Sequence, residues 1–154
     1  MLIIMKKYSK KFDVIWADMD PNRHMRHTAY NDYAAQVRVS YMTDQGLSLE
    51  EMEKLMLAPV LFKEETQFLS EVRLGEQIEV DLQIAGLSAD GERWKMVHHI
   101  RKRDGMLSAI ISVEGAWIDL TKRKLKPPPA SFASNTNALL KTADFQEIVK
   151  RVKG

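Results

Sequence analysis

Two hydrophobic patterns meet in the stretch DMDPNRHMRHTAY, residues 18–30. Just before it, one face of an extended segment carries Phe12, Val14 and Trp16, a period of two that predicts a β-strand. After it, apolar residues recur at spacings of three and four, a period that predicts a helix with one buried face. We therefore expect residues 18–30 to form the loop between a first strand and the start of a helix.

The predicted helix runs from Thr28, a plausible N-cap, to about Asp44, and Gly46 is expected to end it. Its buried stripe consists of Tyr30, Tyr33, Ala34, Val37 and Tyr41. A shorter helix should follow, because Ser48 and Glu51 have the spacing of a capping box.

The residues from Val60 to about Asp119 alternate as β-strands do, most clearly at 78–84, 94–100 and 107–113. Short turns that contain glycine separate these strands, so consecutive strands should pair antiparallel. The helix can bury its stripe only against one face of this sheet, which predicts an α+β fold.

The run Pro127–Pro129 is expected to close the sheet, since proline cannot donate to a strand ladder. We therefore expect a single domain over residues 1–130 and a C-terminal extension over residues 131–154. Apolar spacing in the extension predicts a short amphipathic helix that begins near Asp144. Its apolar residues are Phe145, Ile148, Val149 and Val152.

The composition of the 154 residues excludes several classes of function. There is no cysteine, so a disulfide framework, a thiol nucleophile and a thiolate metal site are excluded. The net charge of +2 is too small to make nucleic acid or an anionic membrane the main partner, but it permits a small anionic ligand. The apolar run Met1–Met5 is too short for a signal peptide or a membrane span, so a cytoplasmic location is expected.

The loop at residues 18–30 holds two carboxylates, two imidazoles and an amide. Asp and Asn are common in turns, so these side chains can simply satisfy backbone donors. The position of the loop favours chemistry, because free N–H groups at a helix N-terminus stabilise a developing negative charge. A less favoured alternative is a cation held by Asp18, Asp20, His24 and His27. We predict no metal and no cofactor. The chain also has no Walker, Gly-rich phosphate or Gly-x-Ser-x-Gly motif.

The pattern Asp-x-Asp-x-x-x-His-x-x-x-x-x-Tyr in this loop resembles the signature of the 4-hydroxybenzoyl-CoA thioesterase-like hotdog proteins, which are acyl-CoA thioesterases. The run Leu74-Gly75-Glu76 before an alternating strand is similar to a second segment of that family. The resemblance covers about residues 8–130. It implies a hotdog fold, in which an antiparallel sheet wraps a long central helix.

The resemblance also implies catalytic roles. Asp20 matches the catalytic carboxylate, which acts as base or nucleophile. His27 matches the residue whose backbone N–H polarises the thioester carbonyl, while His24 and Tyr30 match the histidine and the tyrosine of the signature. Arg23 stands where glycine is usual. If that glycine needs a positive φ, arginine predicts a somewhat different loop path.

An acyl-CoA or acyl-carrier-protein thioester is therefore the expected substrate, and a homodimer or homotetramer is the expected assembly. Basic residues should meet the CoA phosphates, with Lys102 and the run Lys122–Lys124 as further candidates. The candidate substrate-binding residues are Asn22, Arg26, Phe62, Phe68, Arg73, Arg101 and Arg103. Two alternatives remain open: a hotdog hydratase or dehydratase, and a non-catalytic module that binds acyl thioesters.

Overall fold

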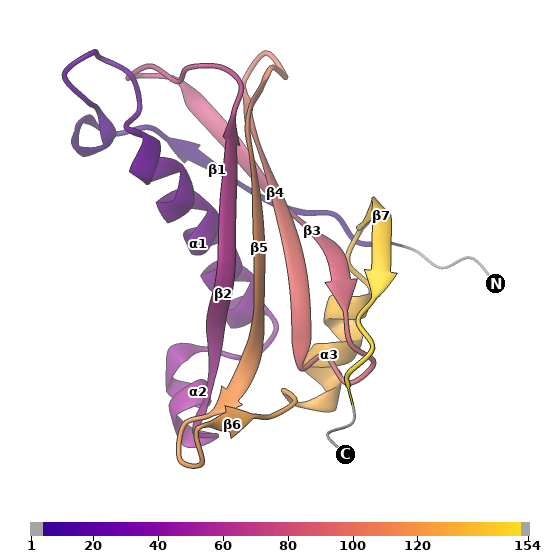
Figure 1. Cartoon of the computed structure of the whole chain (residues 1–154). Coiled ribbons are helices and arrows are strands. Elements are labelled where there is room, and N and C mark those ends of the chain that lie inside the picture. The colour runs from indigo at the N-terminus through magenta and orange to yellow at the C-terminus, as the bar shows by residue number, and fades with distance from the viewer. Residues whose placement is uncertain (1–4, 152–154) are drawn as a thin grey trace.

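An antiparallel sheet curls against one long face of helix α1 in the computed structural model, which describes residues 5–151 (Figure 1). The main strands are β1 (Tyr8–Asp13), β2 (Leu57–Phe68), β3 (Gln77–Leu87), β4 (Arg93–Lys102) and β5 (Leu107–Asp119). Their order across the sheet is β1-β3-β4-β5-β2, so β2 lies at one edge. All four of these neighbouring pairs are antiparallel. The short turns predicted this for β3–β4 and β4–β5, whereas β1–β3 and β2–β5 pair strands that are not consecutive in the chain.

Helix α1 (His27–Asp44) has 18 residues and is therefore about 27 Å long. Its predicted stripe is confirmed, with Tyr33 the one member that is only partly buried. The predicted N-cap is wrong: Arg26 holds that position, and the Thr28 hydroxyl accepts a hydrogen bond from the Arg26 guanidinium instead of capping the helix. Gly46 follows the helix end with a φ of 88°, as a helix stop requires.

Helix α2 (Leu49–Lys54) begins as the capping box predicted. The Ser48 hydroxyl accepts a hydrogen bond of 3.1 Å from the Glu51 amide. A one-turn 3-10 helix, η1 (Trp16–Asp18), and a short strand, β6 (Lys124–Leu125), complete this part of the chain.

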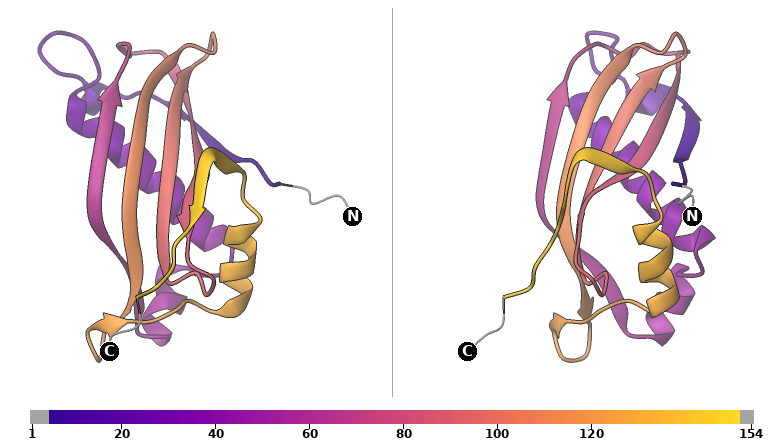
Figure 2. Two further views of the ribbon diagram at one scale, coloured as in Figure 1. Left: turned by 45° about the vertical axis from the view of Figure 1, so that its right-hand side comes forward. Right: turned by 90° about the vertical axis from the view of Figure 1, so that its right-hand side faces the viewer.

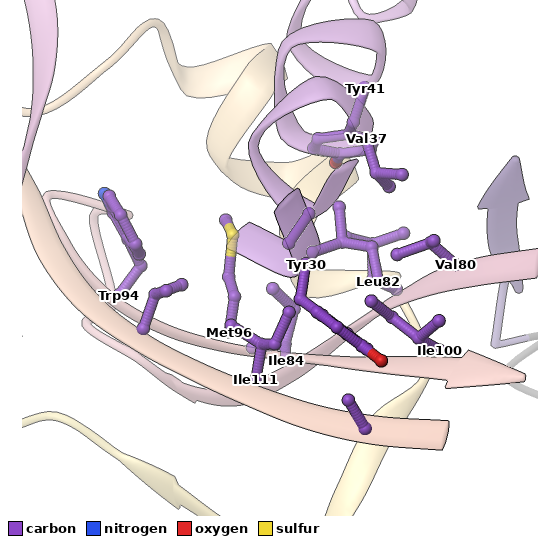
Figure 3. Close-up of a cluster of buried hydrophobic side chains, with 14 of the residues drawn as sticks. Tyr30, Val37, Tyr41, Val80, Leu82, Ile84, Trp94, Met96, Ile100 and Ile111 are labelled. Atoms are coloured by element: carbon purple, nitrogen blue, oxygen red, sulfur yellow. The ribbon is translucent and has the colours of Figure 1, made fainter. Parts of the chain in front are cut away.

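The core lies between α1 and the concave side of the sheet (Figure 3). Every second residue of β3 and β4 points into it, which confirms the period of two in the sequence. The inward residues of these two strands are Ile78, Val80, Leu82, Ile84, Trp94, Met96, His98 and Ile100. Burial of this apolar surface is the main force that holds α1 on the sheet.

The first strand ends earlier than predicted. β1 stops at Asp13, and the Val14 amide turns to donate to the Glu76 carbonyl. Trp16 lies in η1 with 79% of its surface exposed, so it does not continue the buried face of the strand.

The predicted C-terminal helix is wrong within the described residues, and Val152 lies outside them. A helix, α3 (Ala130–Asn137), directly follows the prolines, and β7 (Lys141–Glu147) follows it. The physical reason is a free stretch on the edge of β3. Strand β1 pairs only with residues 77–82 of β3, and β7 pairs in parallel with residues 84–87 of β3, which β1 does not reach. The prolines therefore do not close the sheet. Figure 2 shows α3 beside α1 on the concave side.

Within residues 5–151, no helix is both long enough and apolar enough to cross a membrane.

Candidate active site

The loop between β1 and α1 lies at one end of the sheet, beside the β2–β3 connection (Figure 1). The Met25 amide donates a 2.7 Å hydrogen bond to the Val72 carbonyl, and His24 forms an antiparallel bridge with Arg73. Within the loop, the Arg26 amide donates to the Asp18 carbonyl at 2.7 Å. These bonds close the loop directly before α1 and so fix the Asp20 backbone relative to the helix start.

Asp20 holds the turn of this loop with one of its two carboxylate oxygens. Its Oδ1 accepts the amides of Asn22 at 2.9 Å and His24 at 3.2 Å. Its Oδ2 accepts no hydrogen bond from any residue in the described part of the chain. The side chain is partly exposed. The carboxylate is therefore oriented through one oxygen, while the other is free to accept a proton or to attack a carbonyl.

Arg23 has a φ of 67°, which is the left-handed region that glycine favours. The turn therefore keeps the backbone conformation of a glycine, and the different path predicted from arginine is wrong in this respect. A bulky residue in this conformation costs about 1 kcal/mol.

Asp18 has a structural role, as the turn interpretation of this residue predicted. It is 8% exposed, and its Oδ2 accepts a hydrogen bond from the Tyr33 hydroxyl on α1. Burial raises the pKa of Tyr33, and the Asp18 carboxylate raises it further. Tyr33 thus stays a neutral donor that ties the loop to α1.

The start of α1 offers free backbone donors. Neither the His27 amide nor the Thr28 amide donates to another residue among those described. The helix has no side-chain cap, and Arg26 reaches Asp32 at 3.4 Å and the Ala17 carbonyl at 3.4 Å. Two open N–H groups at the positive end of a helix dipole favour an oxyanion.

The two histidines of the loop have different surroundings. His24 Nε2 lies 3.0 Å from Glu71 Oε2, whereas the His27 side chain is exposed. In the part of the chain that is described, no three His, Asp or Glu side chains are grouped so as to hold a metal ion. The four-residue cation site considered from the sequence is therefore not formed.

Tyr30 lies in the core rather than in the open part of the loop (Figure 3). Its ring meets the edge of the Phe68 ring at a centroid distance of 5.1 Å, and burial raises the pKa of its hydroxyl. Phe68 and Phe62 are about half exposed on β2, where Phe62 occupies a bulge in the pairing with β5.

Most of the predicted basic residues lie at the same end of the sheet as the loop. The β4–β5 hairpin carries Arg101 and Arg103, which border a hollow of about 250 Å³. Lys102 is bound to the Glu71 carbonyl and to Glu76. The run Lys122–Lys124 lies in the β5–β6 turn at the opposite end of the sheet (Figure 1), so these two groups of charges do not converge in one chain.

A comparison with family models matches residues 14–136 to the thioesterase-like superfamily. The chain belongs to the thioesterase-like superfamily. The matched part of this superfamily member includes the Asp20 loop, α1, strands β2 to β6 and nearly all of α3. Its curled antiparallel sheet with few helices is the hotdog fold, and the resemblance seen in the sequence is confirmed. No curated protein matches its sequence.

Solved structures similar to this superfamily member include CoA thioesterases. SAV2348 of Staphylococcus aureus, solved in complex with CoA, has a TM-score of 0.83 at 26% identity, with 95% of this chain and 93% of that one covered. A 1,4-dihydroxy-2-naphthoyl-CoA thioesterase of Synechocystis has a TM-score of 0.77 at 19% identity, with coverage of 86% and 96%. The gentisyl-coenzyme A thioesterase BH1999 has a TM-score of 0.71 at 17% identity, with 85% of this chain and 99% of that one covered.

The superfamily member also has a buried polar pair that the sequence interpretation did not use. Arg38 Nη1 lies 3.0 Å from His98 Nε2, and His98 Nδ1 lies 2.7 Å from the Asp81 carbonyl. A carbonyl only accepts, so Nδ1 carries the proton and Nε2 accepts from Arg38. The signal was present in the sequence: Arg38 continues the stripe at Tyr30 and Ala34, with a spacing of four.

Burial and, to a smaller extent, the Arg38 charge lower the pKa of His98 to about 4. The pKa of a histidine in the unfolded chain is about 6.5, so as the pH falls from about 6.5 to 4 only the unfolded state takes up this proton. The contribution of His98 to the free energy of unfolding should therefore be constant above this range and fall within it, by about 3 kcal/mol at the lower end. Urea unfolding at several pH values measures how the free energy of unfolding changes with pH. In His98→Gln the fall between about pH 6.5 and 4 that is due to His98 should be absent. An equal fall in the wild-type protein and in His98→Gln would show that His98 is not its source.

Proposed function

We propose that this superfamily member hydrolyses an acyl-CoA thioester to a free acid and CoA. The observation that carries the proposal is the Asp20 carboxylate, whose free Oδ2 is held in the loop that runs into the open amides at the start of α1. Family membership and the CoA thioesterases among the structural neighbours support the same class of reaction.

In the proposed reaction, the His27 amide donates a hydrogen bond to the thioester carbonyl and stabilises the oxyanion. Asp20 Oδ2 then takes a proton from water as the water attacks, or it attacks the carbonyl itself to form a mixed anhydride that water hydrolyses. In both routes the C–S bond breaks, the thiolate takes up a proton, and the products are a carboxylic acid and the CoA thiol. Oδ1 stays bound to the loop amides, which keeps Oδ2 in place.

We assign supporting roles to the other predicted catalytic residues. The exposed imidazole of His27 is positioned to carry a proton to the leaving thiolate. His24 orients the loop through Glu71, and Tyr30 fixes the first turn of α1 against β2 through its contact with Phe68. Asn22 and Arg26 shape the loop, and the exposed Phe62 and Phe68 offer apolar surface to the acyl part of the substrate.

We place the phosphates of CoA near Arg73, Arg101 and Arg103, which lie at the same end of the sheet as Asp20. None of the three forms an ion pair with another described residue, so their charges are available. Exposed charges act through a screened field, so each contributes little and the effect depends on salt.

Arg101→Gln combined with Arg103→Gln should raise KM for acyl-CoA about 3- to 10-fold at low salt and leave kcat nearly unchanged. The salt dependence of KM should also become weaker. The matched control removes the same charge at the opposite end of the sheet, with Lys122→Gln and Lys124→Gln. Steady-state kinetics over a range of salt concentrations compare the two proteins. Equal KM changes in both would reject the phosphate site.

We also propose that two copies pair through the free edge of β2. The edge strand exposes unpaired backbone groups, and its side chains Leu61 and Phe62 are 48% and 58% exposed, a combination that favours a partner strand. A monomer in light scattering at assay concentration would reject this pairing.

The alternative is a module that binds acyl thioesters without cleaving them. Arg26 favours it to a limited extent, because its guanidinium is bound within the loop beside the helix start. Measurement of acyl-CoA binding and of free thiol in the same sample separates the two functions. A thioesterase releases thiol in amounts above the enzyme concentration, whereas a binding module gives binding without thiol.

A further inference from the structure

A cavity of about 230 Å³ lies between the second half of α1 and strands β2, β4 and β5, and none of the residues assigned to catalysis lines it. Its walls are mainly apolar and contain several aromatic rings. They include Val39, Met42, Met96, Trp117 and Phe132. Two further lining residues, Trp94 and Arg38, bring polar groups to this apolar space.

Trp94 has a buried hydrogen-bond donor with no acceptor. The side chain is 4% exposed, and its Nε1 is the one buried side-chain nitrogen or oxygen that lacks a partner among residues 5–151. Figure 3 shows the ring standing off β4 with this nitrogen at its far end. An unmade hydrogen bond of a buried group costs about 1 to 3 kcal/mol, so a ligand that supplies an acceptor here gains that amount.

Arg38 brings a positive charge that no carboxylate neutralises. Its one side-chain hydrogen bond among the described residues goes to His98, which is neutral because its Nε2 accepts this bond while its Nδ1 donates to the Asp81 carbonyl. It forms no ion pair within the described chain. Burial lowers the pKa of Arg38, and the more distant charge of Glu64 opposes this effect only in part. A guanidinium has five N–H groups, so donors remain for a ligand.

Apart from the Tyr41 hydroxyl, the polar side-chain groups of the lining residues are donors. Arginine and the indole of tryptophan cannot accept hydrogen bonds, and the Tyr41 hydroxyl is engaged with Thr136 at 3.1 Å. The complementary ligand therefore has an apolar body and an oxygen acceptor at its end. The uncompensated charge of Arg38 favours a negatively charged acceptor over a neutral one.

We propose that this cavity receives the distal end of the acyl group and that the preferred acyl group ends in a carboxylate. This inference rests on the proposed thioesterase function. Cavity residues 35–42 of α1 lie about 12 to 22 Å along the helix from His27. Within one chain, an acyl group of medium or long length is therefore needed to connect the thioester to Arg38 and Trp94.

The test compares acyl-CoAs of equal length that end either in a carboxylate or in a methyl group. The wild-type protein should favour the carboxylate by about 10-fold or more in kcat/KM. Arg38→Met should lower this ratio about 10- to 100-fold, and Trp94→Phe, which keeps an aromatic ring, about 3- to 10-fold. The control Arg151→Met removes an equal charge from an exposed position and should leave the ratio unchanged. Because both acyl-CoAs are measured with the same sample, a loss of folded protein in a variant does not change the ratio of the two kcat/KM values.

Calorimetric titration provides a second measurement, which does not depend on hydrolysis. It compares the binding affinity of free dicarboxylates with that of alcohols of equal length. The wild-type protein should bind the dicarboxylate more tightly, and Arg38→Met should lose this difference. If no acyl-CoA is hydrolysed but the dicarboxylate difference is present, the thioesterase function fails and the cavity assignment holds. A wild-type ratio near one, or a ratio that Arg38→Met does not change, overturns the inference.

Discussion

Replacement of Asp20 by alanine is expected to lower kcat/KM for acyl-CoA hydrolysis by about 100- to 10,000-fold. The variant removes both carboxylate oxygens: Oδ2, which we propose as base or nucleophile, and Oδ1, which holds the amides of Asn22 and His24. Measurement of thiol release under steady-state conditions gives kcat/KM for the variant and for the wild-type protein.

Asp20→Asn separates chemistry from loop structure. The amide oxygen can still accept from the Asn22 and His24 amides, but the side chain can no longer take up a proton or form an anhydride. If Asp20 acts chemically, Asp20→Asn should lose nearly as much activity as Asp20→Ala while its thermal stability stays close to that of the wild type. Near-normal kcat/KM in Asp20→Asn would mean that Asp20 only holds the turn.

A second large effect is expected at Gly115, in the middle of β5. A Cβ there would lie 2.2 Å from the Val60 carbonyl oxygen on β2 and 2.5 Å from the Trp94 ring. The first neighbour is backbone in the β2–β5 ladder, so it cannot move without breaking strand pairing. Gly115→Ala should therefore lower the free energy of unfolding by about 3 kcal/mol, the upper part of the range for overpacked cores.

Gly105→Ala is the matched control for this prediction. Gly105 has a φ of 87°, but no atom lies within 4 Å of its added Cβ. Strain alone should cost about 1 kcal/mol there. Urea unfolding of both variants measures the difference. Gly115 has no positive φ, so a loss at Gly115→Ala no larger than that at Gly105→Ala would show that Val60 and Trp94 do not crowd the added Cβ.

Much of the fold could be predicted because it depends on local periods in the sequence. The stripe on α1 and the alternation along β3, β4 and β5 both reflect burial of one face. The C-terminal segment could not be predicted in this way. Phe145 and Ile148 fit a short helix as well as a strand, and the choice depends on the part of β3 that β1 leaves unpaired.

The candidate site could be predicted in part. The composition and position of the loop indicated carboxylate chemistry beside a helix start, and the family resemblance implied Asp20. Whether a carboxylate oxygen remains free depends on the geometry of the turn. Arg38 and His98 both lie at positions that the periods assign to the core. Their pairing depends on how α1 crosses β4, which no local pattern specifies.

We infer that this chain cleaves acyl-CoA thioesters with Asp20. The most direct test of this inference is the initial rate of free thiol release from short, medium, long and aromatic acyl-CoAs, measured for the wild-type protein and for Asp20→Asn in parallel. We expect multiple turnovers by the wild-type protein with at least one acyl-CoA, and a rate at least about 100-fold lower for Asp20→Asn. Equal rates for the two proteins, or no release above the spontaneous rate with any acyl-CoA, would contradict the inference.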